Sequence, residues 1–395
     1  MRRAWLILAL VVASTAVGLM GTDLVLPAVP SLPAALGGGA PAAQLVLAAY
    51  AAGTCLGLLA FGSLGQSLST RLLFVASLAA TALLSFACSL SPGIWTLVAL
   101  RALQGAVAAG PAVFAPGIVK ALFDETRGVR ALGLLGSIES LAPALAPILG
   151  AWLLAIGGWQ LSFQVLAALS AGLALAVLAA SKVPQVGRRA RGSYLHLLRS
   201  RVFLRYALSQ AFLLGGLLTF VFGMPAVFVH ALGGTLTDFI AMQVTGVAAF
   251  ILAANLSGAA STRFGAEALI GFGTAMAAIG AAAQLAYALA GGSNTAAIVA
   301  LFVPVNAGLG LRGPPGFYRA VLASGGDDGR GSALVILFIL AAAAFGTAAA
   351  SPLIDNGPVP LAAIAFLLQL AGVASLALLP RLPDRQPDEI EIVAS

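Results

Sequence analysis

The amino-acid sequence predicts an all-α membrane protein with twelve transmembrane helices in two six-helix bundles. Composition is the first reason for this prediction. Of the 395 residues, 61% are hydrophobic and only 8% are charged, and the mean hydropathy is +1.04. A soluble domain carries about 25% charged residues, so too few charges remain here to cover a surface in water. Lipid must cover that surface, and helices cross lipid because they satisfy their own backbone hydrogen bonds.

The apolar runs are the second reason. They are long, continuous and rich in alanine and leucine, whereas a membrane barrel would show alternating apolar residues. Glycine and proline separate the runs, as at 37–39, 157–158 and 357–358. A span needs about 20 apolar residues. The predicted spans are 5–29, 41–62, 71–90, 93–119, 130–156, 160–181, 203–230, 236–258, 266–291, 295–318, 331–353 and 358–380.

The placement of lysine and arginine is the third reason. If the N-terminus is cytoplasmic, every such residue except Arg101 falls at or near a cytoplasmic end of a span, including Arg205 and Arg312. This is the positive-inside pattern, and it predicts a multi-pass inner-membrane protein with both termini in the cytoplasm. It explains the formal net charge of +7 without a nucleic-acid partner. The first run is longer than a typical signal core, so we expect a span and not a signal peptide.

The longest polar break, 181–202, holds six Lys or Arg residues and no acidic residue, and it divides the spans six and six. Two similar bundles joined by a basic cytoplasmic linker are therefore expected. A segment of this kind anchors topology and touches anionic lipid. The predicted organisation is a first bundle at 1–181, a linker at 182–202, a second bundle at 203–380 and a cytoplasmic tail at 381–395.

Several classes of function are disfavoured by what the sequence lacks. Cys55 and Cys88 are the only cysteines, and both lie in apolar runs, so neither a disulfide framework nor a metal motif can be built from them. No phosphate-binding loop, dinucleotide fingerprint or nucleophile motif is present. We therefore expect no enzyme, no cofactor and no metal. Active transport by such a chain would draw on an ion or proton gradient.

Three ionisable residues lie inside apolar spans: Asp23, Arg101 and Glu139. Each costs about 2.5–3.5 kcal/mol to insert, so such residues tend to pair, face a cavity and mark transport or proton pathways. Asp23 and Arg101 lie at about the same depth, roughly 10–12 Å from the outer end, which predicts a buried pair. Gln104, three residues after Arg101, is expected to hydrogen-bond that pair. The pair is either a proton-responsive switch or a static structural contact.

Glu139 falls near the middle of its span with no basic residue at matching depth, which suits a proton carrier or a counter-charge for a cationic substrate. The alternative is a neutral carboxyl bonded to nearby backbone. Other polar or aromatic residues within spans are candidates for a substrate cavity, although each alone is more often a helix–helix contact. These are Tyr50, Gln104, Gln44, Phe220 and Asn306, with Gln210 and Asn255 noted in the same way. Prolines at 111, 116, 143 and 147 predict kinks, which rocking transporters use.

The order of these motifs resembles the major facilitator superfamily over essentially the whole chain. Arg101-Ala102-Leu103-Gln104-Gly105 is similar to its R-x-x-Q-G motif, which implies a role for Arg101 in proton coupling. Residues 142–150, with Pro143, Pro147 and Gly150, resemble the antiporter motif of helix 5. Together with Asp23 and Arg312-Gly313-Pro314, these residues resemble the drug:proton antiporter group, most of all its bicyclomycin and chloramphenicol resistance branch. Glu139 is not part of the resemblance.

The loops that gate this family depart from its pattern. After the second span, Gly62, Leu64 and Arg71 match, but Gln66 replaces the usual acid and Ser67 the usual arginine. The counterpart loop keeps Gly258, Arg263 and Gly265, and Thr262 stands in place of the acid. The usual charge latch of these loops is therefore altered in this chain.

The resemblance and the buried charges together predict a secondary transporter that exports small amphipathic drugs or metabolites in exchange for protons. The expected partners are a small-molecule substrate, protons and membrane lipid, with the chain a monomer. Two alternatives stay open at this point. One is metabolite uptake by symport or uniport, and the other is a membrane receptor that transports nothing.

Overall fold

The computed structural model describes residues 2–65, 67–123, 125–180, 183–185, 194–325 and 328–382; of residues 2, 3, 116, 120, 125–144, 328 and 329 it describes the backbone alone. The elements of the first half are α1 (Arg2–Asp23), η1 (Leu26–Ser31), α2 (Leu32–Leu36), α3 (Gly39–Leu64), α4 (Thr70–Ser89), α5 (Ile94–Ala108), α6 (Gly110–Leu122) and α7 (Glu125–Ala179). Those of the second half are α8 (Tyr194–Arg199), α9 (Arg201–Ala226), η2 (Val227–Ala231), α10 (Leu236–Phe264), α11 (Ala266–Leu289), α12 (Thr295–Leu322), α13 (Asp328–Ala350), η3 (Ser351–Asn356) and α14 (Pro358–Leu378).

Within the described chain, eleven helical segments are long and apolar enough to cross a membrane. One of them, α7, is two helices joined at Gly157 and Gly158, where the backbone leaves helical geometry and Gly158 takes a φ of 70°. Glycine adopts this left-handed conformation without steric penalty. Counting the two limbs of α7 separately gives the twelve spans predicted from the sequence, with the break at the predicted position.

Two helices end or break where the sequence places proline. α1 stops at Asp23, and the 3-10 turn η1 with Pro27 and Pro30 follows, because proline cannot continue an α-helical ladder. The fourth span breaks between α5 and α6, one residue before Gly110-Pro111. Pro111 has no N–H to donate to the Val107 carbonyl, and the Ser77 hydroxyl donates to it instead, at 2.6 Å. The helical hydrogen bonding is therefore interrupted next to Pro111, where the sequence predicts a kink.

The apolar cores show which end of the molecule is closed. The largest core joins the two halves at the end away from the termini, where residues such as Leu26 and Val46 of the first half belong to one cluster with Phe228 and Ile354 of the second. At the other end each half has a core of its own. Polar contacts also cross the closed end, as from the Ser351 hydroxyl to the Pro41 carbonyl, 2.5 Å.

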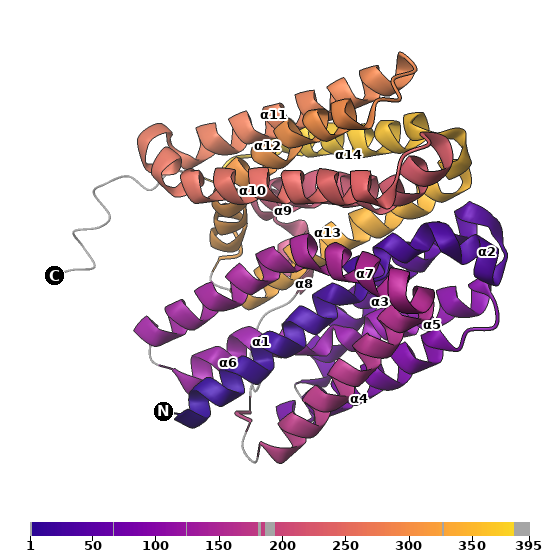
Figure 1. Ribbon diagram of the computed structural model, residues 1–395. Helices are drawn as coiled ribbons and strands as arrows, with labels where there is room; N and C mark the ends of the chain where they lie inside the picture. The colour runs from indigo at the N-terminus through magenta and orange to yellow at the C-terminus, as the bar shows by residue number, and fades with distance from the viewer. Residues whose placement is uncertain are drawn as a thin grey trace.

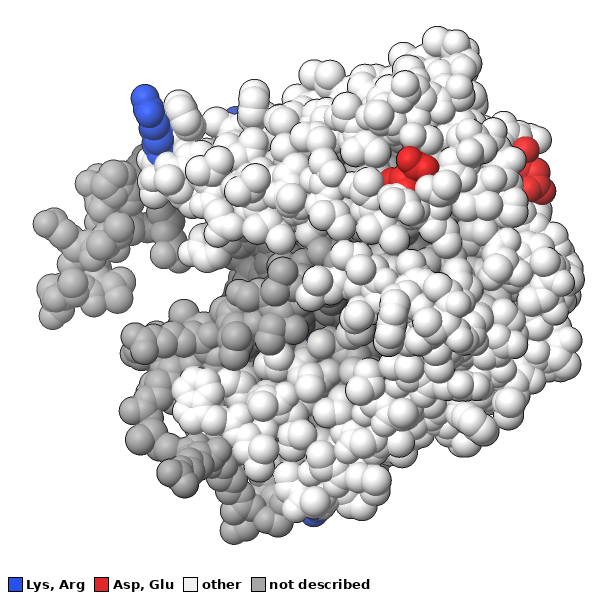
Figure 2. Space-filling view, viewed as in Figure 1, with Lys and Arg blue, Asp and Glu red and all other residues white. Residues whose placement is uncertain are grey.

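The open end is the one that carries the termini. Figure 1 shows the first half below and the second half above, with the start of α1 on the left. Figure 2 shows the surface deeply hollowed between the halves on that same side. The structure is therefore an inward-open arrangement if the termini are cytoplasmic.

Candidate charge site and substrate cavity

Arg101 is fully buried inside the first bundle, on α5. Its Nε donates to the Val46 carbonyl of α3 at 3.3 Å, and its Nη1 donates to the Gln104 Oε1 at 2.7 Å. The guanidinium carbon lies 4.0 Å from the centroid of the Tyr50 ring, a cation–π contact that strengthens when water is excluded. Nη2 has no hydrogen-bond partner. The guanidinium charge is thus stabilised by a backbone carbonyl, a side-chain amide and an aromatic ring, and the Nη2 donor makes no hydrogen bond.

Gln104 extends this contact toward α4. Its Nε2 donates to the Ser85 hydroxyl at 2.6 Å, and that hydroxyl donates to the Thr81 carbonyl at 2.6 Å. The hydrogen bond between Arg101 and Gln104 that the three-residue spacing predicted is confirmed. Arg101 is therefore oriented from two sides, by α3 and by α4.

The ion pair predicted between Asp23 and Arg101 is absent. Both residues are described, and no ion pair within 4.0 Å joins them. Asp23 is half-buried at the last position of α1, whereas Arg101 points onto the Tyr50 ring. The Tyr50 hydroxyl donates to the Gly18 carbonyl of α1 at 2.7 Å and lies within electrostatic range of both charges. Equal depth along two helices says nothing of how the side chains are rotated. In the structure Tyr50 lies against the Arg101 guanidinium and bonds the backbone of α1 at Gly18.

Glycine lets the helices around this site approach closely. A Cβ at Gly105 would collide with the Tyr50 carbonyl, and a Cβ at Gly53 would collide with the Ala102 carbonyl. Small residues at such interfaces allow backbone contact within membranes. Gly150 of α7 meets the Leu24 carbonyl, directly after Asp23, in the same way. The glycine of the helix 5 motif therefore packs beside Asp23, which sequence reasoning had not predicted.

A cavity of about 900 Å³ opens among α9, α10, α12 and α13 of the second half. Its wall is mostly apolar, with Leu214, Val221 and Phe250 among the lining residues. Ligand cavities commonly combine such a wall with a few polar groups. The polar groups here are the amides of Gln210, Gln243 and Asn306, together with the Tyr318 and Ser332 hydroxyls.

The structure places the five predicted cavity residues differently. Asn306 lines the cavity, as expected, while its Nδ2 donates to the Phe302 carbonyl at 2.9 Å. Tyr50, Gln104 and Gln44 are buried inside the first bundle and are not among the residues that line this cavity. Both amide atoms of Gln44 lack a hydrogen-bond partner. The sequence does not reveal how each helix is rotated about its axis relative to its neighbours. It therefore could not separate residues that face the cavity from residues that face the bundle interior.

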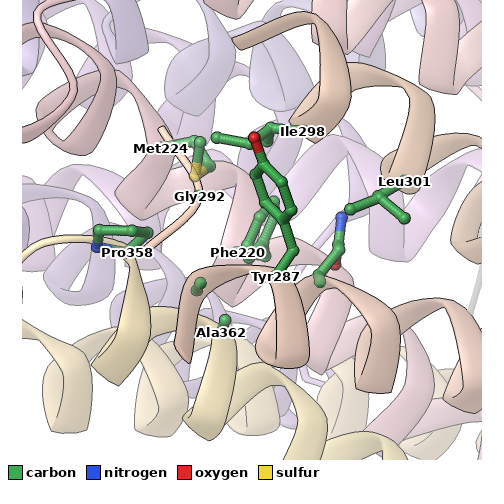
Figure 3. A pocket seen from close by; sticks show the side chains of 10 residues that line it. Phe220, Met224, Tyr287, Gly292, Ile298, Leu301, Pro358 and Ala362 are labelled. Carbon is green, nitrogen blue, oxygen red and sulfur yellow. The ribbon is translucent and has the colours of Figure 1, made fainter. Parts of the chain in front are cut away.

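Phe220 lies away from the large cavity. Its ring stacks on Phe302 with centroids 5.8 Å apart. It also lines a narrow space at the closed end, with Met224, Tyr287 and Pro358 around it (Figure 3). That space holds about 10 Å³, which is room for a water molecule at most. Phe220 is therefore a packing residue in this conformation.

Two further cations, predicted at or near helix ends, are buried. Arg312 has no exposed surface and lies on α12 within the second bundle. Its Nη1 donates to the Ser209 carbonyl at 3.3 Å, while Nε and Nη2 have no partner. Arg205 is also buried, and its Nη2 pairs with Glu267 at 3.4 Å. The positive-inside count had treated both as ordinary cations at a cytoplasmic end.

The predicted gating loops carry no charge latch of their own in the described residues. The Arg71 Nη2 donates to the Leu178 carbonyl at 2.5 Å, and the Arg263 guanidinium lies 5.3 Å from the Phe264 ring centroid. Gly62 and Gly258 leave open space, since a Cβ at either would meet nothing closer than 3.6 Å. Gly258 lines a second cavity of about 710 Å³, next to the first.

A charge network that the sequence did not predict stands near the second loop. Glu267, in the first turn of α11, accepts from the Tyr206 hydroxyl at 2.6 Å and pairs with Arg205. The Arg319 Nε lies 4.0 Å from the same carboxylate. These residues come from α9, α11 and α12, so the network ties three helices of one bundle together. The sequence did offer one sign of this network, because Glu267 is an acidic residue that follows Gly265 of the second loop by two positions.

Three predicted positions lie outside the described side chains: the candidate site residues Glu139 and Pro143, and Pro116. Pro147 and Gly150, from the same motif, are described and buried. The depth and surroundings of Glu139 stay predictions.

The fold and the cavity define a class: a polytopic helical membrane protein whose two halves share a core at one end only, with a large cavity in the second half. Residues 11–332 match the Major Facilitator Superfamily, which is most of the chain. The chain belongs to that superfamily.

Curated relatives point to the predicted branch. The chain is 32% identical over 226 residues to an uncharacterized transporter of this type, YdgK of Bacillus subtilis, which covers 53% of this chain and 55% of the relative. It is 24% identical to a bicyclomycin resistance protein homolog of Haemophilus influenzae, over 63% of this chain and 65% of that protein. It is 27% identical to a chloramphenicol resistance protein of Pseudomonas aeruginosa, over 64% and 62%. The matches span less than two thirds of the length of these relatives.

Solved structures share the fold. A bacterial homolog of the human lysosomal transporter Spinster, in an inward-facing and unoccupied conformation, superposes with a TM-score of 0.71 at 14% identity over 95% of each chain. The nucleoside transporter NupG, as a D323A mutant, gives 0.67 at 14% identity over 94% of this chain and 98% of that one. At these identities the likeness concerns the fold alone.

Proposed function

We propose that this transporter exports small amphipathic compounds in exchange for protons, by alternating access between its two bundles. We further propose that it acts as a monomer in the inner membrane with both termini cytoplasmic. The observation that carries the proposal is the 900 Å³ cavity, whose apolar wall holds the amides of Gln210, Gln243 and Asn306. Such a wall accepts apolar rings and chains, and the amides orient one or two polar groups.

Proton coupling is assigned to Asp23, Arg101 and Glu139. Carboxyl groups inside apolar spans are typical of proton pathways. Arg101 has a donor atom, Nη2, without a partner, and Tyr50 connects its guanidinium to α1 five residues before Asp23. In this proposal, a change in the charge of Asp23 acts on Arg101 through Tyr50 and shifts the packing of α3 against α5. Glu139 supplies a second carboxyl within an apolar span.

Export is favoured over uptake by two lines of support. Relatives of this chain are named for resistance to bicyclomycin and to chloramphenicol. The buried Pro147 and Gly150 belong to a motif that resembles the antiporter pattern, and Gly150 packs against the backbone beside Asp23.

The proposal is tested by efflux in a host that lacks its own exporters, with a panel of amphipathic antibiotics that includes chloramphenicol. We expect the chain to lower accumulation of at least one compound, and an uncoupler to abolish the effect. Arg101→Ala and Glu139→Gln are expected to reduce proton-coupled efflux at least tenfold while the protein still inserts. Asn255→Ala, at an exposed position of α10, is the matched control and should retain efflux.

Wild-type efflux from both charge variants would refute the assigned roles. Flux in proteoliposomes decides the direction. Under an imposed proton gradient, movement of the compound in the direction opposite to the proton flow supports antiport. Movement in the same direction as the protons would establish the symport alternative.

A further inference from the structure

A pocket separate from the substrate cavity lies at the end of the second bundle that carries the C-terminus. It has a volume of about 240 Å³ and sits where α9 and α11 begin and α14 ends. Figure 1 places α11 at the edge of the molecule away from the first half. The pocket therefore faces the surroundings of the bundle and not the cleft between the halves.

The helices around this pocket present apolar side chains to the outside. Phe272 and Ile279 of α11 and Leu367 and Leu378 of α14 are exposed, Leu378 at 82%. Apolar residues exposed along transmembrane helices contact lipid chains. Inside the pocket, Ile270, Val373 and Leu376 continue this apolar surface up to the polar wall. The pocket thus has a lipid-facing side and a polar end at the level where the helices leave the membrane.

The polar wall holds buried atoms without partners. The Thr274 hydroxyl is only 3% exposed and makes no hydrogen bond, and the Arg205 Nε, in a residue that is 5% exposed, makes none either. Most buried polar groups in folded proteins are hydrogen-bonded. Two such atoms in the wall of one pocket indicate that a ligand group with acceptor oxygens completes the site.

The charges around the pocket favour an anion. Arg381 lines its rim and is exposed. Arg205 lies in the wall, where its Nη1 also donates to the Leu376 and Leu379 carbonyls at the end of α14. The one acid in the wall, Glu267, is already engaged by Arg205, by Arg319 and by the Tyr206 hydroxyl. An arriving anion therefore meets cationic groups while the acid is neutralised by its neighbours.

We propose that this pocket binds the headgroup phosphate of an anionic phospholipid from the leaflet at the terminus-bearing end. Arg381 and Arg205 supply the charge-assisted contacts that phosphate oxygens accept. Thr274 supplies a hydroxyl, and the acyl chains follow Ile270, Val373 and Leu376. The bound lipid would hold α9, α11 and α14 together beside the Glu267 network. The inference rests on the membrane location of the chain and not on the direction of transport.

The test is a lipid titration of the purified full chain in neutral detergent, followed by native mass spectrometry. The probes are phosphatidylglycerol, phosphatidylcholine and inorganic phosphate. We expect phosphatidylglycerol to form a saturable one-to-one adduct about tenfold more readily than phosphatidylcholine, since the latter carries a compensating cation. Arg381→Gln should weaken it about fivefold, the effect of one arginine near a membrane surface. Thr274→Val, which keeps the shape of the side chain, should weaken it about threefold.

Arg263→Gln is the matched control, because Arg263 is exposed at the same end but lies outside the pocket. It should leave the adduct unchanged. Equal weakening by Arg263→Gln and Arg381→Gln would overturn the site in favour of general surface charge. Equal binding of phosphatidylcholine would overturn the anionic ligand, and displacement of the lipid by inorganic phosphate at matched concentration would overturn lipid as the source.

Discussion

At the scale of single residues, Arg101 and Arg312 are both fully buried and differ in the groups that surround their charge. Arg101 donates two hydrogen bonds and lies on the Tyr50 ring, whereas Arg312 donates one hydrogen bond, at 3.3 Å. No carboxylate within 4.0 Å pairs with either in the described residues. Burying a charge without compensation is unfavourable. The environment of Arg101 compensates for most of that penalty, and the environment of Arg312 does so much less.

Replacement by methionine, which keeps length and removes charge, should therefore separate the two positions. Arg312→Met is expected to leave the free energy of unfolding within about 1 kcal/mol of wild type or to raise it. Arg101→Met loses charge-assisted hydrogen bonds and a cation–π contact, and it should be less stable than Arg312→Met by about 2 kcal/mol. Unfolding of the purified protein in detergent, followed by circular dichroism, measures both.

A marked loss of stability in Arg312→Met would contradict this account of the site. If Arg312→Met instead keeps its stability and loses efflux, the charge serves transport. Gln210, which lines the cavity and whose Oε1 has no partner, is the adjacent group through which such a charge would act.

At the scale of secondary-structure elements, the contact of α3 with α5 sets the position of Arg101. Gly53 and Gly57 of α3 meet the carbonyls of Ala102 and Ala106, and Gly105 of α5 meets the carbonyl of Tyr50. Each of these neighbours is backbone, so it cannot move aside as a flexible side chain can. The two helices can lie this close only because no Cβ intervenes.

A single methyl group at this contact should therefore destabilise the bundle. Gly53→Ala is expected to lower the free energy of unfolding by about 1–3 kcal/mol, the usual effect of overpacking. Gly172→Ala is the matched control, because a Cβ there meets nothing within 4 Å. It should raise stability by up to about 1 kcal/mol through helix propensity. Thermal unfolding of both variants gives the sign, and the same sign for both would contradict the close-contact interpretation.

Much at this scale followed from the sequence, and the reasons are physical. Long apolar runs bounded by glycine and proline can only be spans in lipid, so the twelve helices and the break at 157–158 were predicted correctly. The contact of Arg101 with Gln104 followed from helical spacing. The direct pair of Asp23 with Arg101 was wrong, because depth along a helix axis says nothing of rotation or of what lies between. The prediction that Tyr50 and Gln44 line the cavity failed for the same reason, since both side chains are buried inside the first bundle.

The network around Glu267 could not be predicted from spacing. Arg205 and Tyr206 lie on α9 and Arg319 lies on α12, all far in the sequence from Glu267 on α11, and only the tertiary fold brings them to that carboxylate. Arg312 was counted among the helix-end cations because the end of α12 is not marked in the sequence. The helix continues to Leu322, which puts Arg312 inside the bundle.

At the scale of the whole molecule, the two halves share one apolar core at the closed end and have separate cores at the open end. Alternating access requires the shared core to part while the open end closes. The closed end is held by contacts between the halves, among them those of Ser351 with Pro41 and of His230 with the Pro30 carbonyl at 3.2 Å. Fixing this end should therefore stop the cycle without touching the cavity or the charged residues.

A disulfide at the closed end tests this requirement. In the double variant Pro41→Cys with Ser351→Cys, the two thiols are introduced at residues of opposite halves that are in contact at the closed end, and bridging under oxidising conditions is checked by mass spectrometry. Efflux should then fall at least tenfold, and reduction should restore it. Each single variant, oxidised in the same way, should transport at the wild-type rate and so excludes an effect of Cys55 or Cys88. Full efflux by protein that is shown to be bridged would mean that the closed end need not open, and that the substrate leaves by another route.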